Sequence, residues 1–273
     1  MLSLDEIIKY ALEEDRAFDD VTTEFVVGRG LKARARAVAK SHGVMAGGWV
    51  AEKVFKTVDP GLFFLQEKAE GKEFSPGEVL FRVEGEASSI LKGERVSLNF
   101  LQRLCGIATL TRRFVEAVEG TGVKIMDTRK TTPLLRLLEK YAVKMGGGEN
   151  HRFDLREMVL IKENHIEAAG SVQEAVRRAR KSGKFVEVEV KNLQELEEAL
   201  SAGADRVMLD NLPLEEIKKA VALAKGKVEL EASGGVSLEN VREIAEAGVD
   251  MISVGSLTHS FRSSDISLLL EVI

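Results

Sequence analysis

The chain of 273 residues contains a single cysteine, no excess of basic residues and no long hydrophobic run. One cysteine, Cys105, excludes a disulfide within the chain, and its apolar surroundings indicate a small buried side chain rather than a nucleophile. No hydrophobic run approaches the roughly 18 residues that a membrane span needs. The net charge of −5 offers no general surface for nucleic acid. We therefore expect a cytoplasmic globular protein without nucleic-acid or membrane partners.

Strand patterns dominate the first part of the chain after an amphipathic helix at Ser3–Glu14. Residues 32–39 alternate polar and apolar side chains, as a half-buried strand does, and 62–66 and 79–83 are further short strands. Helical spacing follows from Ser88 to Val118, with an expected division near Gly106. The pattern predicts a small α+β domain.

After residue 122 short apolar strands alternate with amphipathic helices. Such repeats predict a parallel sheet with right-handed crossovers. Six repeats are clear, and Tyr141–Met145 is a candidate for a seventh strand. A doubly wound open sheet is the alternative, but no G-x-G-x-x-G follows a strand. The six strands are expected to end near Met126, Ile161, Val190, Leu209, Leu230 and Val254.

Cationic side chains gather where two of these strands end, within the stretch 123–166. Arg129 and Lys130 follow one apolar run, Lys162 follows another, and Arg152 lies between them after a three-glycine turn. Charges that follow strand ends are typical of sites in parallel α/β enzymes. The alternative is that these are solvated loop charges, since most lysines and arginines are exposed. The group suits a small substrate with several negative charges.

Acidic and glycine-containing strand ends supply the rest of a predicted site. Glu189 and Asp210 are suited to holding hydrated Mg²⁺ or sugar hydroxyls. Glu187 shares a face with Glu189, and we favour Glu189 because it lies nearer the strand's end. The turns at 233–235 and 255–259 expose backbone N–H groups that can hold a phosphate, although glycine also simply makes turns.

No nucleophile–base pair is convincing. His151, His165 and His259 fall on three candidate loops, and each of them is equally suited to a structural role. Chemistry by positioning and charge neutralisation is the natural inference.

Motifs over nearly the whole chain resemble those of the quinolinate phosphoribosyltransferase family, and the stretch from Asp127 to Ile166 is the most specific. The matching segments are Glu94-Arg95 through Thr109, 127–133 (DTRKTTP), 146–148 (GGG), 150–152 (NHR), 160–162 (LIK) with Asn164-His165, 187–189 (EVE), 208–211 (MLDN), 233–235 (SGG) and 255–259 (GSLTH). The chain departs from the family's pattern at Leu134, where glycine is usual, and at Glu163, where aspartate is usual.

The resemblance implies an N-terminal α/β sandwich domain, here residues 1–106, and an incomplete, seven-stranded parallel α/β barrel at 107–273. The site lies at the strand C-terminal ends, and a last helix packs back on the first domain. It also implies a homodimer whose sites are shared between subunits. The reaction joins quinolinate to phosphoribosyl pyrophosphate with Mg²⁺ and releases pyrophosphate and carbon dioxide. The product is nicotinate mononucleotide, on the de novo route to NAD.

Roles for individual residues follow from the same resemblance. The quinolinate carboxylates are expected to bind Arg129, His151, Arg152 and Lys162, with Arg95 contributed by the neighbouring subunit. Lys130 is expected at the phosphorylated substrate or the reacting centre, and Glu189 and Asp210 at the ribose and metal, either directly or through water. The phosphate loops are expected to use Ser233, Gly234, Gly255 and His259.

Three other readings compete with this one. A nicotinate or nicotinamide phosphoribosyltransferase of related fold needs to recognise only one carboxylate or an amide, and four to five pocket cations favour a dicarboxylate. A molybdate-transport-associated paralogue shares similar motifs. A non-catalytic phosphate binder on the same scaffold is disfavoured by Glu189 and Asp210, which a pure anion site would not want.

Overall fold

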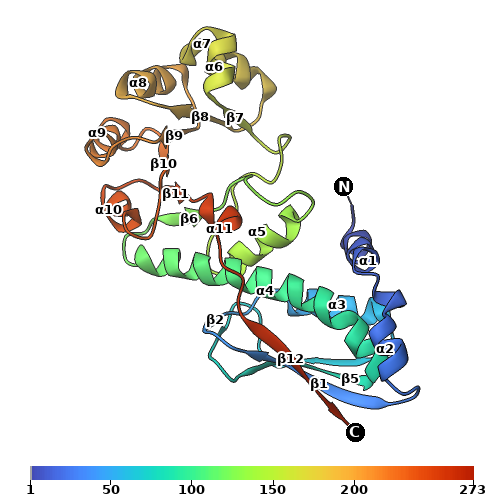
Figure 1. The fold of residues 1–273 in the computed structure, drawn as a ribbon. Coiled ribbons are helices and arrows are strands. Elements are labelled where there is room, and N and C mark those ends of the chain that lie inside the picture. Colours follow the sequence, from blue (N-terminus) through green and yellow to red (C-terminus); the bar gives the residue numbers. More distant parts are fainter. Residues whose placement is uncertain (1) are drawn as a thin grey trace. The chain divides into compact units, whose positions relative to one another are not determined.

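The computed structural model describes residues 2–273, which form two compact units (Figure 1). The first unit comprises the residues up to Arg112 with 132–147 and 260–273, and the second comprises 113–131 and 148–259. The expected boundary at residue 106 falls inside a continuous helix, α4 (Ala87–Ala117), so the predicted break near Gly106 is wrong. A Cβ at Gly106 would lie 2.3 Å from the backbone oxygen of Arg262, so this glycine permits close packing rather than ending a helix.

A four-stranded antiparallel sheet in the order β12-β1-β5-β3 organises the first unit. Its strands are β1 (Lys32–Ala39), β3 (Phe63–Gln66), β5 (Val79–Glu86) and β12 (Ile266–Val272), and β2 (Gly43–Val44) pairs with β4 (Glu73–Phe74) separately. The alternation of β1 buries four alanines in one core with side chains of α3 and α4, as predicted for a half-buried strand. The predicted last helix is wrong, because that segment is β12, which pairs with β1 along seven residue pairs.

Helices complete the first unit. They are α1 (Leu4–Glu14), η1 (Ala17–Asp19), α2 (Val21–Val26), α3 (Gly48–Val58), the first part of α4, and α5 (Arg136–Met145). Ser3 and Glu6 form a capping box at the start of α1, which agrees with the predicted helix. The candidate seventh strand at Tyr141–Met145 is wrong, because Leu138, Ala142 and Val143 are buried with the spacing of a helix.

A six-stranded parallel sheet in the order β6-β11-β10-β9-β8-β7 organises the second unit. Its strands are β6 (Lys124–Met126), β7 (Val159–Ile161), β8 (Val186–Val190), β9 (Arg206–Asp210), β10 (Glu229–Ser233) and β11 (Met251–Ser253). The helices between them are α6 (Glu163–Ala169), α7 (Val172–Ala179), η2 (Arg180–Ser182), α8 (Leu193–Ala202), α9 (Leu214–Ala224), α10 (Val241–Glu246) and α11 (Ser256–His259). Asn192 caps α8 through its side chain and Gly203 ends it in a left-handed conformation, so the crossover from β8 to β9 is short.

The predicted parallel α/β architecture is confirmed, but the expected count of seven strands is wrong. The place of a seventh strand is taken by one parallel bridge between Met126 and Glu149, beyond β6. Two backbone hydrogen bonds hold this bridge: Glu149 N–H donates to Ile125 (2.8 Å) and Asp127 N–H donates to Glu149 (3.1 Å). This short pairing directs the chain from Glu149 to His151 at the same edge where the strands end.

Candidate active site

A cavity of about 540 Å³ lies at the C-terminal ends of the strands of the second unit. This is the size range of small-ligand sites. Nine of the twelve predicted site residues line it: Arg129, Lys130, His151, Arg152, Lys162, Glu189, Asp210, Ser233 and Gly234. The parallel register explains the convergence, because the strands all end at one edge of the sheet.

Two arginines, Arg129 and Arg152, dominate one wall, and we call them the arginine pair. The Nε of each is buried and has no hydrogen-bond partner among the described residues. Arg152 holds its place by donating from Nη1 to the backbone oxygen of Met158 (3.1 Å). Burial and then the positive charge of Arg129 lower the pKa of the Arg152 guanidinium. An anion bound between the two arginines would thus accept hydrogen bonds from the free donors and offset the repulsion between the two positive charges.

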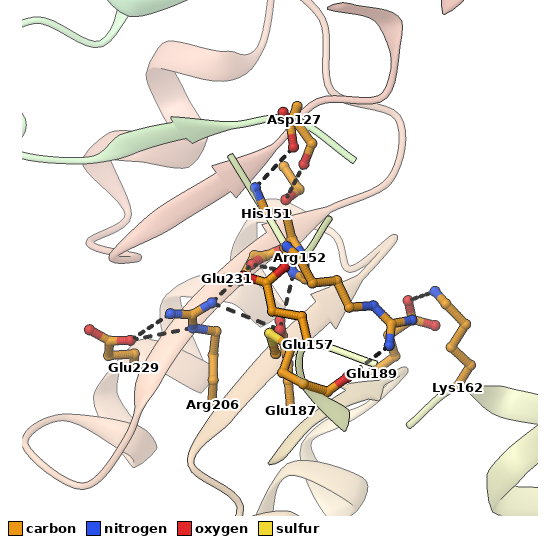
Figure 2. Close-up of polar contacts among 12 residues, drawn as sticks. Asp127, His151, Arg152, Glu157, Lys162, Glu187, Glu189, Arg206, Glu229 and Glu231 are labelled. Carbon is orange, nitrogen blue, oxygen red and sulfur yellow. Dashed lines mark hydrogen bonds and ion pairs between the residues drawn. The ribbon is translucent and has the colours of Figure 1, made fainter. Parts of the chain in front are cut away.

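Lys162 connects the cationic wall to the acidic side of the cavity. It follows β7, and its side chain forms an ion pair with Glu189 at the end of β8 (Figure 2). The backbone N–H of Lys162 donates to Nδ1 of His165 (2.9 Å), which closes the first turn of α6. His165 therefore has the structural role that the sequence left open.

Asp210 ends β9 beside Glu189 on the cavity wall. Its carboxylate makes no hydrogen bond or ion pair with another residue in the part of the chain that the structure describes. Carboxylate oxygens are hard ligands that suit Mg²⁺. Asp210 fits such an ion as the residues stand, whereas Glu189 fits it only when Lys162 turns to another anion.

The turn after β10 packs against Asn211, the residue after Asp210. Asn211 has a left-handed backbone (φ 56°), and its N–H donates to the backbone oxygen of Ser233 (2.8 Å). Gly234 has φ 90°, and a Cβ there would lie 2.3 Å from Oδ1 of Asn211. Glycine is therefore required at 234 both for conformation and for space.

Three of the predicted residues do not line the cavity. Gly255 adjoins it, because a Cβ there would lie 3.0 Å from Nε2 of His259 and 3.2 Å from Cδ of Lys130. Thr258, in the same turn, donates its hydroxyl to the backbone oxygen of Lys130 (2.9 Å) and so holds that loop. Arg95 belongs to the first unit, where it is an exposed residue of α4.

Beneath the cavity lie two glutamates that sequence reasoning missed or set aside. Glu187 and Glu231 are fully buried below His151, a predicted residue that is 7% exposed. The backbone N–H of His151 donates to the buried carboxylate of Asp127 (2.9 Å) at the end of β6. The signal for the buried glutamates was present in the two-residue alternation of β8 and β10, since Glu187 and Glu231 lie on the same faces as Glu189 and Ser233.

Leu134 keeps the backbone conformation that glycine would adopt. Its φ is 68°, in the left-handed region, and its side chain is 67% exposed. Within the first unit the neighbouring Thr132 is fixed by Glu139, whose Oε2 accepts from the Thr132 N–H (3.1 Å), and Arg103 holds Glu139 from Nε (3.0 Å). The departure at 134 therefore places a leucine in a backbone conformation that favours glycine.

Comparisons with known proteins cover nearly the whole chain. The model for "Quinolinate phosphoribosyl transferase, C-terminal domain" matches residues 107–269, and the corresponding N-terminal domain model matches 20–105. A Bacillus subtilis protein named probable nicotinate-nucleotide pyrophosphorylase [carboxylating] is 42% identical over 98% of this chain and 93% of its own length. An Arabidopsis thaliana chloroplastic enzyme of that name is 41% identical over 98% of this chain and 83% of its own. The structure of NadC from Streptococcus pyogenes is 41% identical, with a TM-score of 0.95 over 100% of this chain and 99% of that one.

Proposed function

Because the chain belongs to the quinolinate phosphoribosyltransferase family, we infer that it makes nicotinate mononucleotide for NAD biosynthesis. It transfers the phosphoribosyl group of phosphoribosyl pyrophosphate to quinolinate and releases pyrophosphate and carbon dioxide. One observation carries this inference. The arginine pair, with buried donors that no described residue satisfies, faces a cavity of about 540 Å³ that also holds Lys162.

Quinolinate recognition rests on these cations. A planar guanidinium matches a carboxylate with two parallel hydrogen bonds, so Arg129 and Arg152 suit the two carboxylates of a pyridine ring. Lys162 supplies a third positive charge when its side chain leaves Glu189. Arg95 of a neighbouring subunit supplies a further charge in this proposal, in line with its exposure on α4.

The phosphorylated substrate occupies the other side of the cavity. Glu189 and Asp210 face the ribose, and Mg²⁺ bound by Asp210 and, through water, by Glu189 would neutralise the leaving pyrophosphate. Ser233 and Gly234 offer backbone N–H groups for the 5′-phosphate, with Gly255 and His259 on the adjoining turn. Lys130, whose side chain passes along Gly255, is suited to the charge of the pyrophosphate.

The chemistry needs positioning more than proton transfer. The pyridine nitrogen of quinolinate already carries a lone pair, so it attacks C1 of the ribose without a base. As the C1–O bond to pyrophosphate breaks, positive charge develops on the ribose, and the carboxylates of Glu189 and Asp210 stabilise it. The new cationic ring accepts the electrons of the C2–carboxylate bond, so carbon dioxide leaves and C2 takes a proton. A cationic wall that holds the 3-carboxylate firmly leaves the 2-carboxylate able to depart.

A homodimer in the cytoplasm is part of the proposal. Exposed apolar side chains on and before α2 support an association surface in the first unit: Phe18 (55% exposed), Val21 (65%), Phe25 (82%) and Val26 (76%). Mixing Arg95→Ala with Arg129→Ala subunits tests the shared site, since the mixed dimer has one site without either change. We expect mixing to restore about a quarter of the wild-type rate, given random exchange between subunits. No recovery, with exchange verified by a tag, would refute the shared site.

The decisive assay measures carbon dioxide release from carboxyl-labelled quinolinate. We expect release only when phosphoribosyl pyrophosphate and Mg²⁺ are both present. Turnover of nicotinate or nicotinamide in place of quinolinate would favour a related phosphoribosyltransferase. Binding of the phosphorylated substrate without turnover of any of the three would favour the paralogue associated with molybdate transport or a non-catalytic binder.

A further inference from the structure

A column of polar side chains runs through the interior of the second unit beneath the cavity. Because alternate residues of a strand share a face, Glu187, Arg206 and Glu231 lie on the same side of the sheet as the cavity residues Glu189, Asp210 and Ser233. In the register, Glu187 is opposite Arg206, and Glu231 is opposite Met208 one level higher. Figure 2 shows Glu187, Arg206 and Glu231 lying together beneath His151.

The hydrogen bonds of His151 determine its tautomer. The backbone N–H of Arg152 donates to its Nδ1 (2.7 Å), and a backbone N–H can only donate. Nδ1 therefore carries the lone pair, and the proton of the neutral ring lies on Nε2. Nε2 is 3.1 Å from Oε2 of Glu187 and 3.5 Å from Oε2 of Glu231. Both ring nitrogens thus face the protein, one toward the peptide of Arg152 and one toward the two glutamates.

Glu187 and Glu231, which we call the acid pair, have no other purpose evident in the fold. Both are fully buried, and Oε1 of Glu187 and both carboxylate oxygens of Glu231 have no hydrogen-bond partner among the described residues. Arg206 lies below them, with Nη1 at 3.8 Å from Glu187 and 3.9 Å from Glu231, and offsets one negative charge. Burial raises the pKa of both carboxyl groups, and the negative charge of Glu187 raises the pKa of Glu231 further. An apolar pair would cost the fold less, which indicates a role beyond stability.

These three residues also resemble a set of metal ligands. The ligand atoms of His151, Glu187 and Glu231 lie within 4.8 Å of one another. The guanidinium of Arg206 already supplies a positive charge to both carboxylates, however, and a metal ion would require Nε2 to lose its proton. The geometry fits a hydrogen-bonded support better than a metal centre.

We propose that Glu187 and Glu231 are positioning residues for the quinolinate pocket. Glu187 accepts from Nε2 of His151, and Glu231, 3.5 Å from the same nitrogen, attracts it by charge. Together they fix the imidazole, whose Nδ1 then fixes the peptide of Arg152 and so the guanidinium that binds the substrate. His151 acts here through Arg152 rather than as a direct ligand of the substrate carboxylate. The proposal rests on the proposed function for the identity of the substrate, but the arrangement of His151 can be tested without substrate.

Isosteric variants separate positioning from folding. Glu187→Gln and Glu231→Gln keep the shape of the side chain and remove one acceptor oxygen each. Glu229→Gln is the matched control, because Glu229 is an exposed residue of β10, the strand of Glu231, and its ion pair is with Arg206. We expect Glu187→Gln to raise the KM for quinolinate about tenfold, the scale of one lost hydrogen bond, and Glu231→Gln to raise it by a smaller factor of at least about twofold. The KM for phosphoribosyl pyrophosphate should be nearly unchanged in both variants. Glu229→Gln should alter neither constant. A change below about twofold in the buried variants, or equal changes in both KM values, would overturn the proposal.

The second readout uses nitrogen NMR of the histidine rings in the substrate-free protein, with His151 assigned by His151→Gln. We expect wild-type His151 to carry its proton on Nε2 and to lose this single tautomer in Glu187→Gln with Glu231→Gln combined. A wild-type ring protonated on Nδ1, or a single tautomer unchanged in the double variant, would refute the positioning role even if turnover fails for another reason. A stoichiometric bound transition metal that disappears in the double variant would equally overturn it in favour of a metal site.

Discussion

Replacing Arg129 by methionine is expected to weaken catalysis and strengthen the fold at once. Methionine has a similar length and fills the same space without charge or donors. In the wild type the buried Nε of Arg129 has no partner among the described residues, and its charge lowers the pKa of Arg152. The free protein therefore carries an unfavourable contact that only a bound anion relieves.

The two effects differ in size. A charge-assisted hydrogen bond contributes about 1.5–3 kcal/mol, so loss of a two-point contact with carboxylate should cost about 3 kcal/mol, roughly a hundredfold in kcat/KM for quinolinate. Two like charges that water screens fully repel by about 1 kcal/mol at about 4 Å, and removing a repulsion of this size should raise the Tm by about 2–4 °C. Arg156→Met provides the control, because Arg156 is 91% exposed in the same segment of the chain.

The measurements are steady-state kinetics with quinolinate and thermal unfolding without substrate. Added quinolinate should raise the Tm of the wild type and of Arg156→Met, but barely that of Arg129→Met, because binding stabilises the folded state in proportion to affinity. A fall in kcat/KM of less than about tenfold would contradict the assignment of Arg129 to a substrate carboxylate. A lower Tm in Arg129→Met would show that the arginine pair does not repel in the free protein.

Two further predictions concern the strained turn and the buried acid pair. Leu134→Gly should raise the Tm by a few degrees with unchanged kinetics, since it relieves a backbone strain of about 1 kcal/mol at a left-handed residue. A lower Tm would mean that the added freedom of glycine in the unfolded chain outweighs this strain. Burial raises the pKa of Glu231 from 4.5 to about 8, so the folded chain binds more protons than the unfolded chain between these values, and stability should fall as the pH rises through this range. In Glu231→Gln the Tm should fall less between pH 5 and pH 8 than in the wild type, with Glu229→Gln like the wild type; equal slopes in all three would contradict a buried proton on Glu231.

The sequence predicted the site better than it predicted the elements that carry the site. Arg129, Lys162, Glu189 and Asp210 could be foreseen because parallel strands end at one edge of a sheet, and any charged residue just after a strand must gather there. That argument needs only the strand positions along the chain. It does not need the number of strands, which is why an error of one strand left the group of residues unchanged.

The errors arose where tertiary contacts override local pattern. The segment Ile266–Val272 is a strand because β1 offers an edge to pair with, a fact that its own residues do not encode. Gly106 suggested a break in the helix, but α4 is continuous there. The glycine is needed because the backbone of Arg262 packs closely against it. Tyr141–Met145 was a candidate for a strand because five residues are too few to distinguish a strand from a turn of helix.

The polar column beneath the cavity explains why sequence reasoning did not assign Glu187 and Glu231 to the site, although their alternation with cavity residues was visible. Glu187 and Glu231 look like ordinary polar positions of half-exposed strands, but the interior of this sheet encloses both of them completely. Replacing a buried ionic group with apolar residues often stabilises a protein, so such a group indicates a requirement other than stability. Here the buried glutamates hold His151 in place beneath the cavity. The positive charges of Arg129 and Arg152 repel each other in the free protein, and a bound anion would offset this repulsion. Both features lower the stability of the free protein in favour of a pocket whose shape is set before the substrate binds, and that is the condition under which electrostatic catalysis is most effective.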